Sequence, residues 1–325
     1  MNAPLAITLA CGDYDINRAL LDGSVSPKGV ALTAMSYASP ERHRLMARFG
    51  AFDACEFSLA TYLVMHDQGA PLVAIPAFPH RRFRHSFLFV NSRSGIDTPK
   101  DLEGRKVGLR SWETTAGVWL RGILQDEYGV DLRRVEWLTG DDEDVAFEAP
   151  AGFSIRRLDA DASLTSMLLD GELDALIYPE TPGAAVRGDQ RVKRLFADPK
   201  TEEANYFRRT SNFPIMHTVV IKADLVARHP WLAVSLLNAF RESKERAFRH
   251  MADPRSVSLA WLREALEEQA EIMGPDPWSY NFETSRATVE TLIRYSHEQG
   301  MISRAFPAED LFAPASLVDM PAYVG

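Results

Sequence analysis

The chain has 325 residues, a length that predicts about two domains. Its 46% hydrophobic and 25% charged residues are ordinary for a globular protein, and its net charge of -9 argues against nucleic acid as the main partner. No apolar stretch approaches the ~18 residues of a membrane span. The first eleven residues lack the positive region of a signal peptide, so we expect a cytoplasmic protein without membrane contact.

Strand and helix patterns alternate along the chain, which predicts an α/β fold with mostly parallel sheets. In the first part we expect strands at 5–10, 30–37, 52–57 and 72–78, with helices at 13–21, 39–49 and 59–68. Further on we expect a turn, a short helix and a strand within 98–109, and a helix that is entered at 111–115 and runs to about 128. Strands follow at 135–138 and 171–178, with an acidic surface loop at 140–149 and a helix at 162–169. The last hundred residues are helical in pattern, at 230–248, 259–273 and 285–299.

The two cysteines, Cys11 and Cys55, lie in apolar strand-like runs. Their number and spacing match neither a disulfide framework nor a zinc site. We therefore expect both to be small core residues.

A basic segment precedes a buried strand predicted at 86–90. Its cationic and imidazole side chains are Arg81, Arg82, Arg84, His80 and His85. Arginine binds carboxylates and phosphates through two parallel hydrogen bonds, so this cluster in an acidic protein predicts a site for a small anion. The alternative is a solvated loop stabilised by ion pairs.

The segment 213–221 repeats this arrangement, with Phe-Pro, a short spacer, His217 and an aliphatic strand. Two such segments predict neighbouring strands at which the chain passes between two lobes, with His85 and His217 close together beside a ligand cleft. We expect one lobe to comprise residues 1–88 and 216–325 and the other residues 89–215.

Three other groups follow predicted strands, where ligands bind in open α/β sheets. The candidate side chains in them are Asp13, Glu56, Ser58, Thr114 and Thr115. Thr114 and Thr115 begin a helix, whose free N–H groups favour an anion. Helix capping is the alternative for Asp13 and the threonines, and an ion pair with an arginine is the alternative for Glu56.

The spacing of His80, His85 and His217 matches no metal-binding pattern, and the chain has no glycine-rich phosphate loop or nucleophile elbow. We therefore expect neither a metal nor an organic cofactor. The residues alone predict a two-lobed α/β protein that binds a small anion.

Several segments resemble the 4,5-dihydroxyphthalate decarboxylase family. They are residues 52–63, 75–87, 101–109, 115–124 and 214–217. The arginine-rich segment and Thr-Ala-x-Val-Trp-x-Arg-Gly are the specific ones, whereas Asp-Leu-Glu-Gly-Arg is common among type II periplasmic-binding-protein-like folds. Arg110 departs from the less basic segment that the family leads us to expect.

The resemblance implies a two-lobed, type II periplasmic-binding-protein-like fold with extra C-terminal helices, and a cofactor-independent decarboxylase of a hydroxylated aromatic dicarboxylate. In that interpretation Arg81, Arg82 and Arg84 hold the carboxylate that stays, supported by Thr114 and Thr115. His217 or His85 donates the proton, and Glu56 binds a ring hydroxyl. A solute-binding protein and another lyase on the same fold are the alternatives, and a homo-oligomer is left open.

Overall fold

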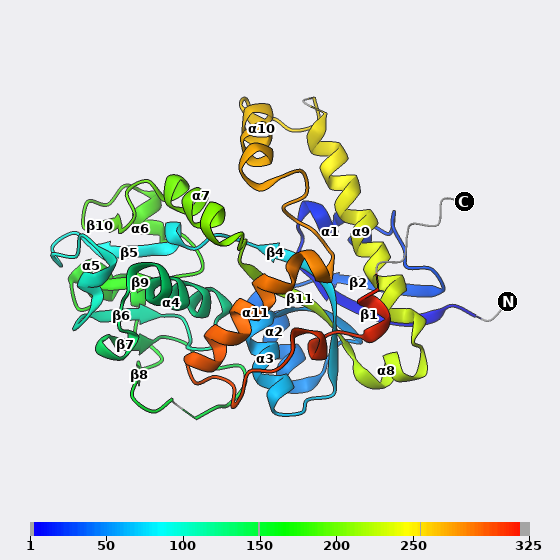
Figure 1. Ribbon diagram of the computed structural model, residues 1–325, viewed down its shortest axis with the longest axis horizontal. Coiled ribbons are helices and arrows are strands. Elements are labelled where there is room, and N and C mark those ends of the chain that lie inside the picture. Colours follow the sequence, from blue (N-terminus) through cyan, green and yellow to red (C-terminus); the bar gives the residue numbers. More distant parts are fainter. Residues whose placement is uncertain (1–2, 149, 254, 319–325) are drawn as a thin grey trace. The chain divides into compact units, whose positions relative to one another are not determined.

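The computed structural model describes residues 3–148, 150–253 and 255–318, and the chain divides into two compact units (Figure 1). The first unit comprises residues 1–81, 215–290 and 306–325, and the second comprises residues 82–214 and 291–305. The sequence prediction had placed 82–88 and 291–305 with the first of these. Each unit contains one mixed sheet with helices, and the two are described separately below.

The sheet of the first unit has the strand order β2-β1-β3-β11-β4. Its strands are β1 (Leu5–Cys11), β2 (Val30–Ser36), β3 (Ala54–Ser58), β4 (Leu72–Arg81) and β11 (Ile215–Lys222). Strands β2, β1 and β3 are parallel, whereas β11 is antiparallel to both β3 and β4. The start of β11 therefore lies at the same edge of the sheet as the carboxyl ends of β1, β3 and β4.

The central strands β3 and β11 are buried on both faces and mostly apolar, and their polar side chains include Glu56 and His217. Cys11 and Cys55 are fully buried in this core, as predicted, and burial raises the pKa of both thiols. The register of β11 against β4 shifts on either side of His217, which indicates bulges next to this residue.

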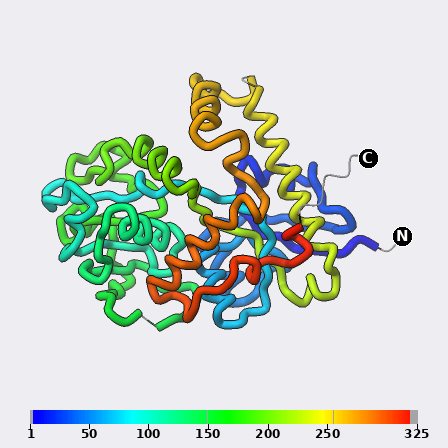
Figure 2. The backbone as a smooth tube through the Cα atoms, in the orientation of Figure 1, coloured from blue at the N-terminus to red at the C-terminus, as the bar shows by residue number. Residues whose placement is uncertain are grey.

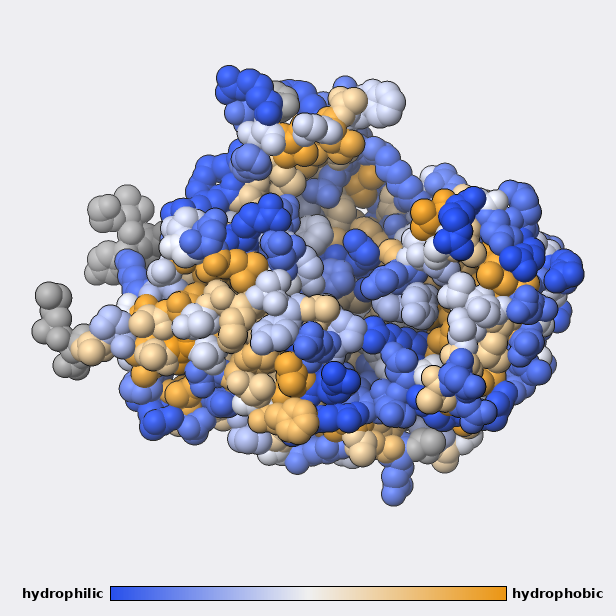
Figure 3. Space-filling model, turned by 180° about the vertical axis from the view of Figure 1, so that it is seen from behind, coloured by the Kyte–Doolittle hydropathy of each residue, from blue (hydrophilic) through white to orange (hydrophobic). Residues whose placement is uncertain are grey.

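Helices of the first unit connect these strands and continue after β11. They are α1 (Asp15–Leu21), α2 (Ser39–Phe49), α3 (Leu59–Asp67), α8 (Ala223–Arg228), α9 (Trp231–Ala252) and α10 (Leu262–Met273), together with the first part of α11 (Phe282–Glu298). Helix α9 packs against α1. The end of α9 and helix α10 project from this unit as an arm (Figure 2), on which apolar side chains are visible (Figure 3).

The sheet of the second unit has the order β10-β5-β9-β6-β7-β8. Its strands are β5 (Leu88–Asn91), β6 (Lys106–Leu109), β7 (Glu136–Thr139), β8 (Ser154–Arg157), β9 (Ala175–Ile177) and β10 (Val192–Arg194). Strand β5 is antiparallel to both β9 and β10, and the other three pairings are parallel. In each sheet one strand, β11 or β5, thus runs against all the others, so the prediction of mostly parallel sheets is confirmed. Leu138, Leu168 and Leu176 are among the buried side chains of its core.

The helices of the second unit are α4 (Thr115–Tyr128), α5 (Leu164–Asp170), α6 (Gly183–Val186) and α7 (Pro199–Thr210), with the last part of α11. Short 3-10 turns occupy His85–Phe87, Pro99–Leu102 and Leu132–Arg134, and two more, Ala308–Leu311 and Pro314–Ser316, follow α11 in the first unit. The strand predicted at 86–90 thus begins only at Leu88.

Helices α4 and α11 pack closely at Gly122, because a Cβ atom there would lie 2.2 Å from Cδ2 of Tyr295. Trp119, one turn earlier on α4, meets the same ring edge to face. The absence of a side chain at position 122 therefore sets how near the two helices come.

We predict that Gly122→Ala destabilises the protein by about 1–3 kcal/mol, the usual effect of overpacking a filled core. The matched control is Gly183→Ala, where a Cβ would meet only the mobile end of the exposed Arg187 side chain. Chemical denaturation of both variants measures the difference. Equal stability of the two variants would contradict the prediction.

Candidate functional site

The first unit holds a buried carboxylate at the carboxyl edge of its sheet. Glu56, on β3, is fully buried, and its Oε1 lies 2.6 Å from Nδ1 of His217 on β11. Its Oε2 accepts a hydrogen bond of 2.7 Å from the backbone N–H of Gly12, directly after β1. One side chain thus joins three strands at the edge where open α/β sheets bind ligands.

Arg42, on α2, supplies the opposite charge. Its Nη2 lies 3.0 Å from Oε1 of Glu56, and both side chains have no exposed surface. Nε of Arg42 also donates a hydrogen bond of 2.7 Å to the backbone carbonyl of Glu56. Because a buried carboxylate without a partner is strongly destabilising, Arg42 supplies the counter-charge that Glu56 requires there.

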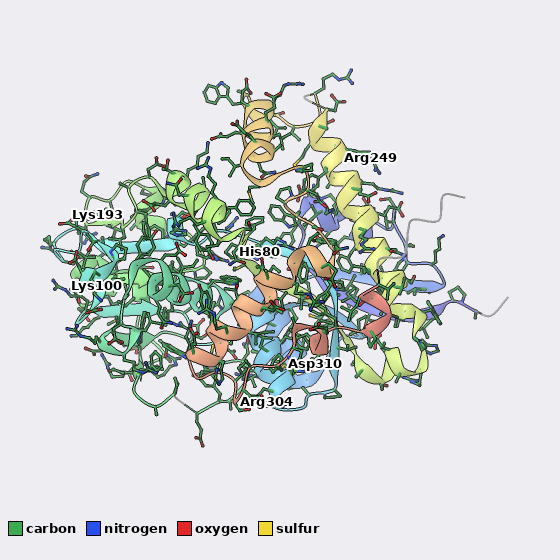
Figure 4. The ribbon with its side chains drawn as sticks, in the orientation of Figure 1. His80, Lys100, Lys193, Arg249, Arg304 and Asp310 are labelled. Carbon is green, nitrogen blue, oxygen red and sulfur yellow. The ribbon has the colours of Figure 1, made fainter. Side chains whose placement is uncertain are left out.

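Two further histidines surround His217. The rings of His43 and His80 each lie 4.7 Å from the His217 ring, both in T-shaped contacts. Figure 4 labels His80 on β4, where it is the register partner of His217, and the ring of Tyr14 lies 5.8 Å from that of His80. Burial and the neighbouring His217 hold the pKa of His43 well below its usual value, so His43 is neutral beside His217.

The contact with Glu56 fixes the tautomer of His217. A carboxylate can only accept a hydrogen bond, so Nδ1 of His217 carries the proton that it donates to Glu56. The side chain of His217 is 9% exposed, whereas that of Glu56 is fully covered. Glu56 therefore orients and stabilises His217.

The structure brings some predicted site residues together. Ser58 lies opposite His217 in the register of β3 and β11, and its hydroxyl accepts hydrogen bonds from Thr61 as the N-cap of α3. Asp13 lies apart from them in an exposed ion pair with Arg18.

The arginine cluster of the sequence is divided between the two units. Arg81 is the last residue of β4, where its buried Nη2 donates to the carbonyl of Ser279 and the hydroxyl of Ser285. Arg82 and Arg84 belong to the second unit, in which Arg82 is exposed and Arg84 is buried. Burial lowers the pKa of Arg81 to about 10 and that of Arg84 to about 9.

His85 is buried in the second unit among the rings of Tyr128, Phe196 and Tyr206. Burial lowers the pKa of its imidazole to about 4. The residue that faces His217 in the sheet is His80, whereas the sequence had led us to expect His85 there.

Thr114 and Thr115 begin α4, as predicted. Thr114 is the N-cap residue, its Oγ1 lies 2.6 Å from the hydroxyl of Ser111, and Thr115 is buried. Close to them, the backbone N–H groups of Trp112 and Glu113 bind the carboxylate of Glu143.

Sequence reasoning missed Arg42, His43 and Tyr14. Arg42 and His43 lie on a short helix rich in charged residues, which is the pattern of a solvated surface helix. The available signal was that Arg42, His43 and Met46 share one face at spacings of three and four residues, and all three are buried.

The family described as NMT1/THI5 like matches residues 27–151. A 4,5-dihydroxyphthalate decarboxylase from Comamonas testosteroni is 36% identical over 322 residues, which cover 96% of this chain and 98% of that protein. A protein of the same name from Pseudomonas putida is 32% identical over 64% of this chain and 83% of its own length. The chain belongs to the 4,5-dihydroxyphthalate decarboxylase family.

The fold is the two-lobed type of periplasmic binding proteins. The aliphatic sulphonate binding protein SsuA from Escherichia coli matches 95% of this chain and 98% of its own with a TM-score of 0.56, at 15% sequence identity. In the part of the chain that the structure describes, no helix has the length and hydropathy to cross a membrane. Within the same residues, no group of three histidine, cysteine or acidic side chains is placed to hold a metal ion.

We predict that Glu56→Gln destabilises the protein by about 3–5 kcal/mol, because it leaves the positive charge of Arg42 buried without its carboxylate. The matched control is Asp224→Asn, which removes a carboxylate paired with Arg228 on the surface and should change stability little. Denaturant titration of both variants tests this. A loss no larger for Glu56→Gln than for Asp224→Asn would show that Arg42 does not depend on this carboxylate.

The lowered pKa of His85 predicts a pH-dependent stability. In the unfolded chain His85 is protonated below about pH 6.5, whereas in the folded chain it stays neutral down to about pH 4. Between these two values protonation favours the unfolded state, so the free energy of unfolding decreases as the pH falls. A shift of this size corresponds to a loss of roughly 3 kcal/mol.

His85→Phe keeps a ring among the same neighbours and should remove this part of the pH dependence. Melting temperatures of both proteins at pH 7.5, 6, 5 and 4.5 measure it. Relative to pH 7.5, the melting temperature of the variant should rise with respect to that of the wild-type protein as the pH falls. Parallel curves throughout would mean that His85 protonates in the folded protein.

Proposed function

We propose that the protein is a cofactor-independent carboxy-lyase. Its substrate would be 4,5-dihydroxyphthalate or a close analogue, and its product a 3,4-dihydroxybenzoate. Membership of the decarboxylase family supports the reaction type, and the buried Glu56–His217 pair, neutralised by Arg42, supports a proton-transfer mechanism. We also propose that the reaction takes place in the cytoplasm.

In the reaction we propose, each substrate carboxylate has a ring hydroxyl para to it. Transfer of the hydroxyl proton to water pushes electron density toward the carbon that bears the carboxylate, and that carbon takes a proton from the His217 imidazolium. The bond to the carboxylate then breaks, its electron pair returns to the ring and carbon dioxide leaves. The ring oxyanion and His217 each regain a proton from water, and the product carries the donated proton where the carboxylate was.

Within this mechanism we propose His217 as the proton donor, since the carboxylate of Glu56 stabilises its protonated form. The sequence interpretation had given Glu56 the ring hydroxyl. Both of its oxygens are engaged, with His217 and Arg42 on one side and Gly12 on the other, so we propose that Glu56 positions His217 instead. The lowered pKa of His85 makes it a poor donor near neutral pH.

Arg82 and Arg84 remain our proposed ligands for the carboxylate that the product keeps. Arg84 is the stronger candidate, because its buried guanidinium carries a charge that an anion would stabilise. For Arg81 the bonds to Ser279 and Ser285 indicate a structural contribution as well. Ser58, Asp13, Thr114 and Thr115 stay candidates for contacts with the substrate.

The decisive test is His217→Gln assayed with 4,5-dihydroxyphthalate by carbon dioxide release and mass analysis of the product. Glutamine keeps a polar side chain but cannot act as an acid near neutral pH, so turnover should fall by about 10²–10⁴ while binding survives. His297→Gln, which changes an exposed histidine of α11, is the control and should keep wild-type turnover.

Near-normal turnover of folded His217→Gln would reject His217 as the donor. If the wild-type protein is stabilised by the dicarboxylate but releases no carbon dioxide, the protein is a solute-binding protein. Chemical change of the substrate without carbon dioxide would instead identify another kind of lyase.

A further inference from the structure

An internal carboxylate occupies an anion-binding site in the second unit. The two oxygens of Glu143 accept hydrogen bonds of 2.7 Å and 3.0 Å from the backbone N–H groups of Trp112 and Glu113. These N–H groups lie between β6 and α4, at the carboxyl end of a parallel strand. Two adjacent N–H donors directed at one carboxylate form a ready-made site for an anion.

A buried guanidinium lies behind the two N–H donors. Arg121, on α4, has no exposed surface, and its Nη2 donates a hydrogen bond of 2.7 Å to the carbonyl of Trp112. Its Nε is held by the side chain of Gln299, while its Nη1 is buried without a hydrogen-bond partner among the described residues. Glu143 is the carboxylate whose charge stabilises this cation.

The same loop carries a second buried carboxyl group. Glu113 is 2% exposed, and one of its oxygens accepts a hydrogen bond from the backbone N–H of Asp144. Burial and the charge of Glu143 raise the pKa of Glu113 to about 8, and burial also raises the pKa of Glu143. A pKa near 8 leaves Glu113 mostly protonated at neutral pH, and burial disfavours the charged form of Glu143 that the two N–H groups bind.

The segment that carries Glu143 belongs to the loop between β7 and β8, which has no helix or strand among its described residues, 140–148. Its neighbouring carboxylates form exposed ion pairs, Asp141 with Arg110 and Asp142 with Arg157. Such pairs stabilise a surface loop only slightly. The N–H groups of Gly140 and Asp141 bind backbone carbonyls at the end of β6, so release of Glu143 concerns residues 142–148 and disturbs no strand pairing of the sheet.

We infer that the N–H groups of Trp112 and Glu113, with Arg121 behind them, bind a carboxylate of the aromatic substrate, and that Glu143 occupies this site in the ligand-free protein. The inference rests on the proposed function for the identity of the ligand. The substrate carboxylate displaces Glu143 and releases residues 142–148 of the loop. Glu143 thereby acts as an internal competitor that lowers the affinity for weakly binding acids.

The test uses phthalate, which has both carboxylates but lacks the ring hydroxyls that the proposed reaction needs. If the site is free of Glu143 in about a tenth of molecules, Glu143→Ala should tighten phthalate binding about tenfold. Glu143→Gln, which keeps the size of the side chain, should also increase the affinity for phthalate. This variant replaces the alanine variant in the test if the latter does not fold. Asp142→Ala removes the adjacent, exposed carboxylate and should leave the affinity unchanged.

Hydrogen exchange of the wild-type protein provides the second readout. Phthalate should speed exchange of the Asp144 amide, whose partner is Glu113, because the loop leaves its site. Unchanged phthalate affinity in both Glu143 variants, or slower exchange at Asp144 with phthalate, would overturn the inference. These measurements do not involve turnover, so absence of carbon dioxide release would reject the proposed reaction and leave this site standing.

Discussion

The desolvated charge of Glu56 is the constraint on which the carboxyl edge of the first sheet depends. A carboxylate with no exposed surface is tolerated only where hydrogen bonds and an opposite charge replace water. Gly12, Arg42 and His217 supply these from after β1, from α2 and from β11. The same bonds fix the orientation of the imidazole, so the requirement that stabilises the fold also prepares the proposed proton donor.

Much of the fold could be predicted from periodicity. The first strand was expected at 5–10 and spans Leu5–Cys11, and the helix expected at 59–68 spans Leu59–Asp67. The short edge strands β8 and β10 were not predicted, because three or four exposed residues give too little alternation to recognise. The antiparallel direction of β11 was also not foreseen, since a buried apolar run has the same pattern in either direction.

The site was less accessible to sequence reasoning. Glu56 and His217 were both selected because they lie at strand ends. The register that places His80 opposite His217 depends on bulges in the pairing of β11 with β4, which no local sequence pattern predicts. Arg81, Arg82 and Arg84 looked like one cluster, whereas the chain passes from one unit to the other after Arg81. Arg42 was overlooked because burial of a helical arginine is decided by a partner on a distant strand.

The two cysteine thiols have a practical consequence. A thiol reacts as its thiolate, and both Cys11 and Cys55 are buried with raised pKa values, so neither should react with maleimides or iodoacetamide while the protein is folded. Since the chain has two cysteines in all, one introduced at the surface would be the single labelling position. Fluorophores or spin labels could then be attached to the native sequence without first removing any thiol.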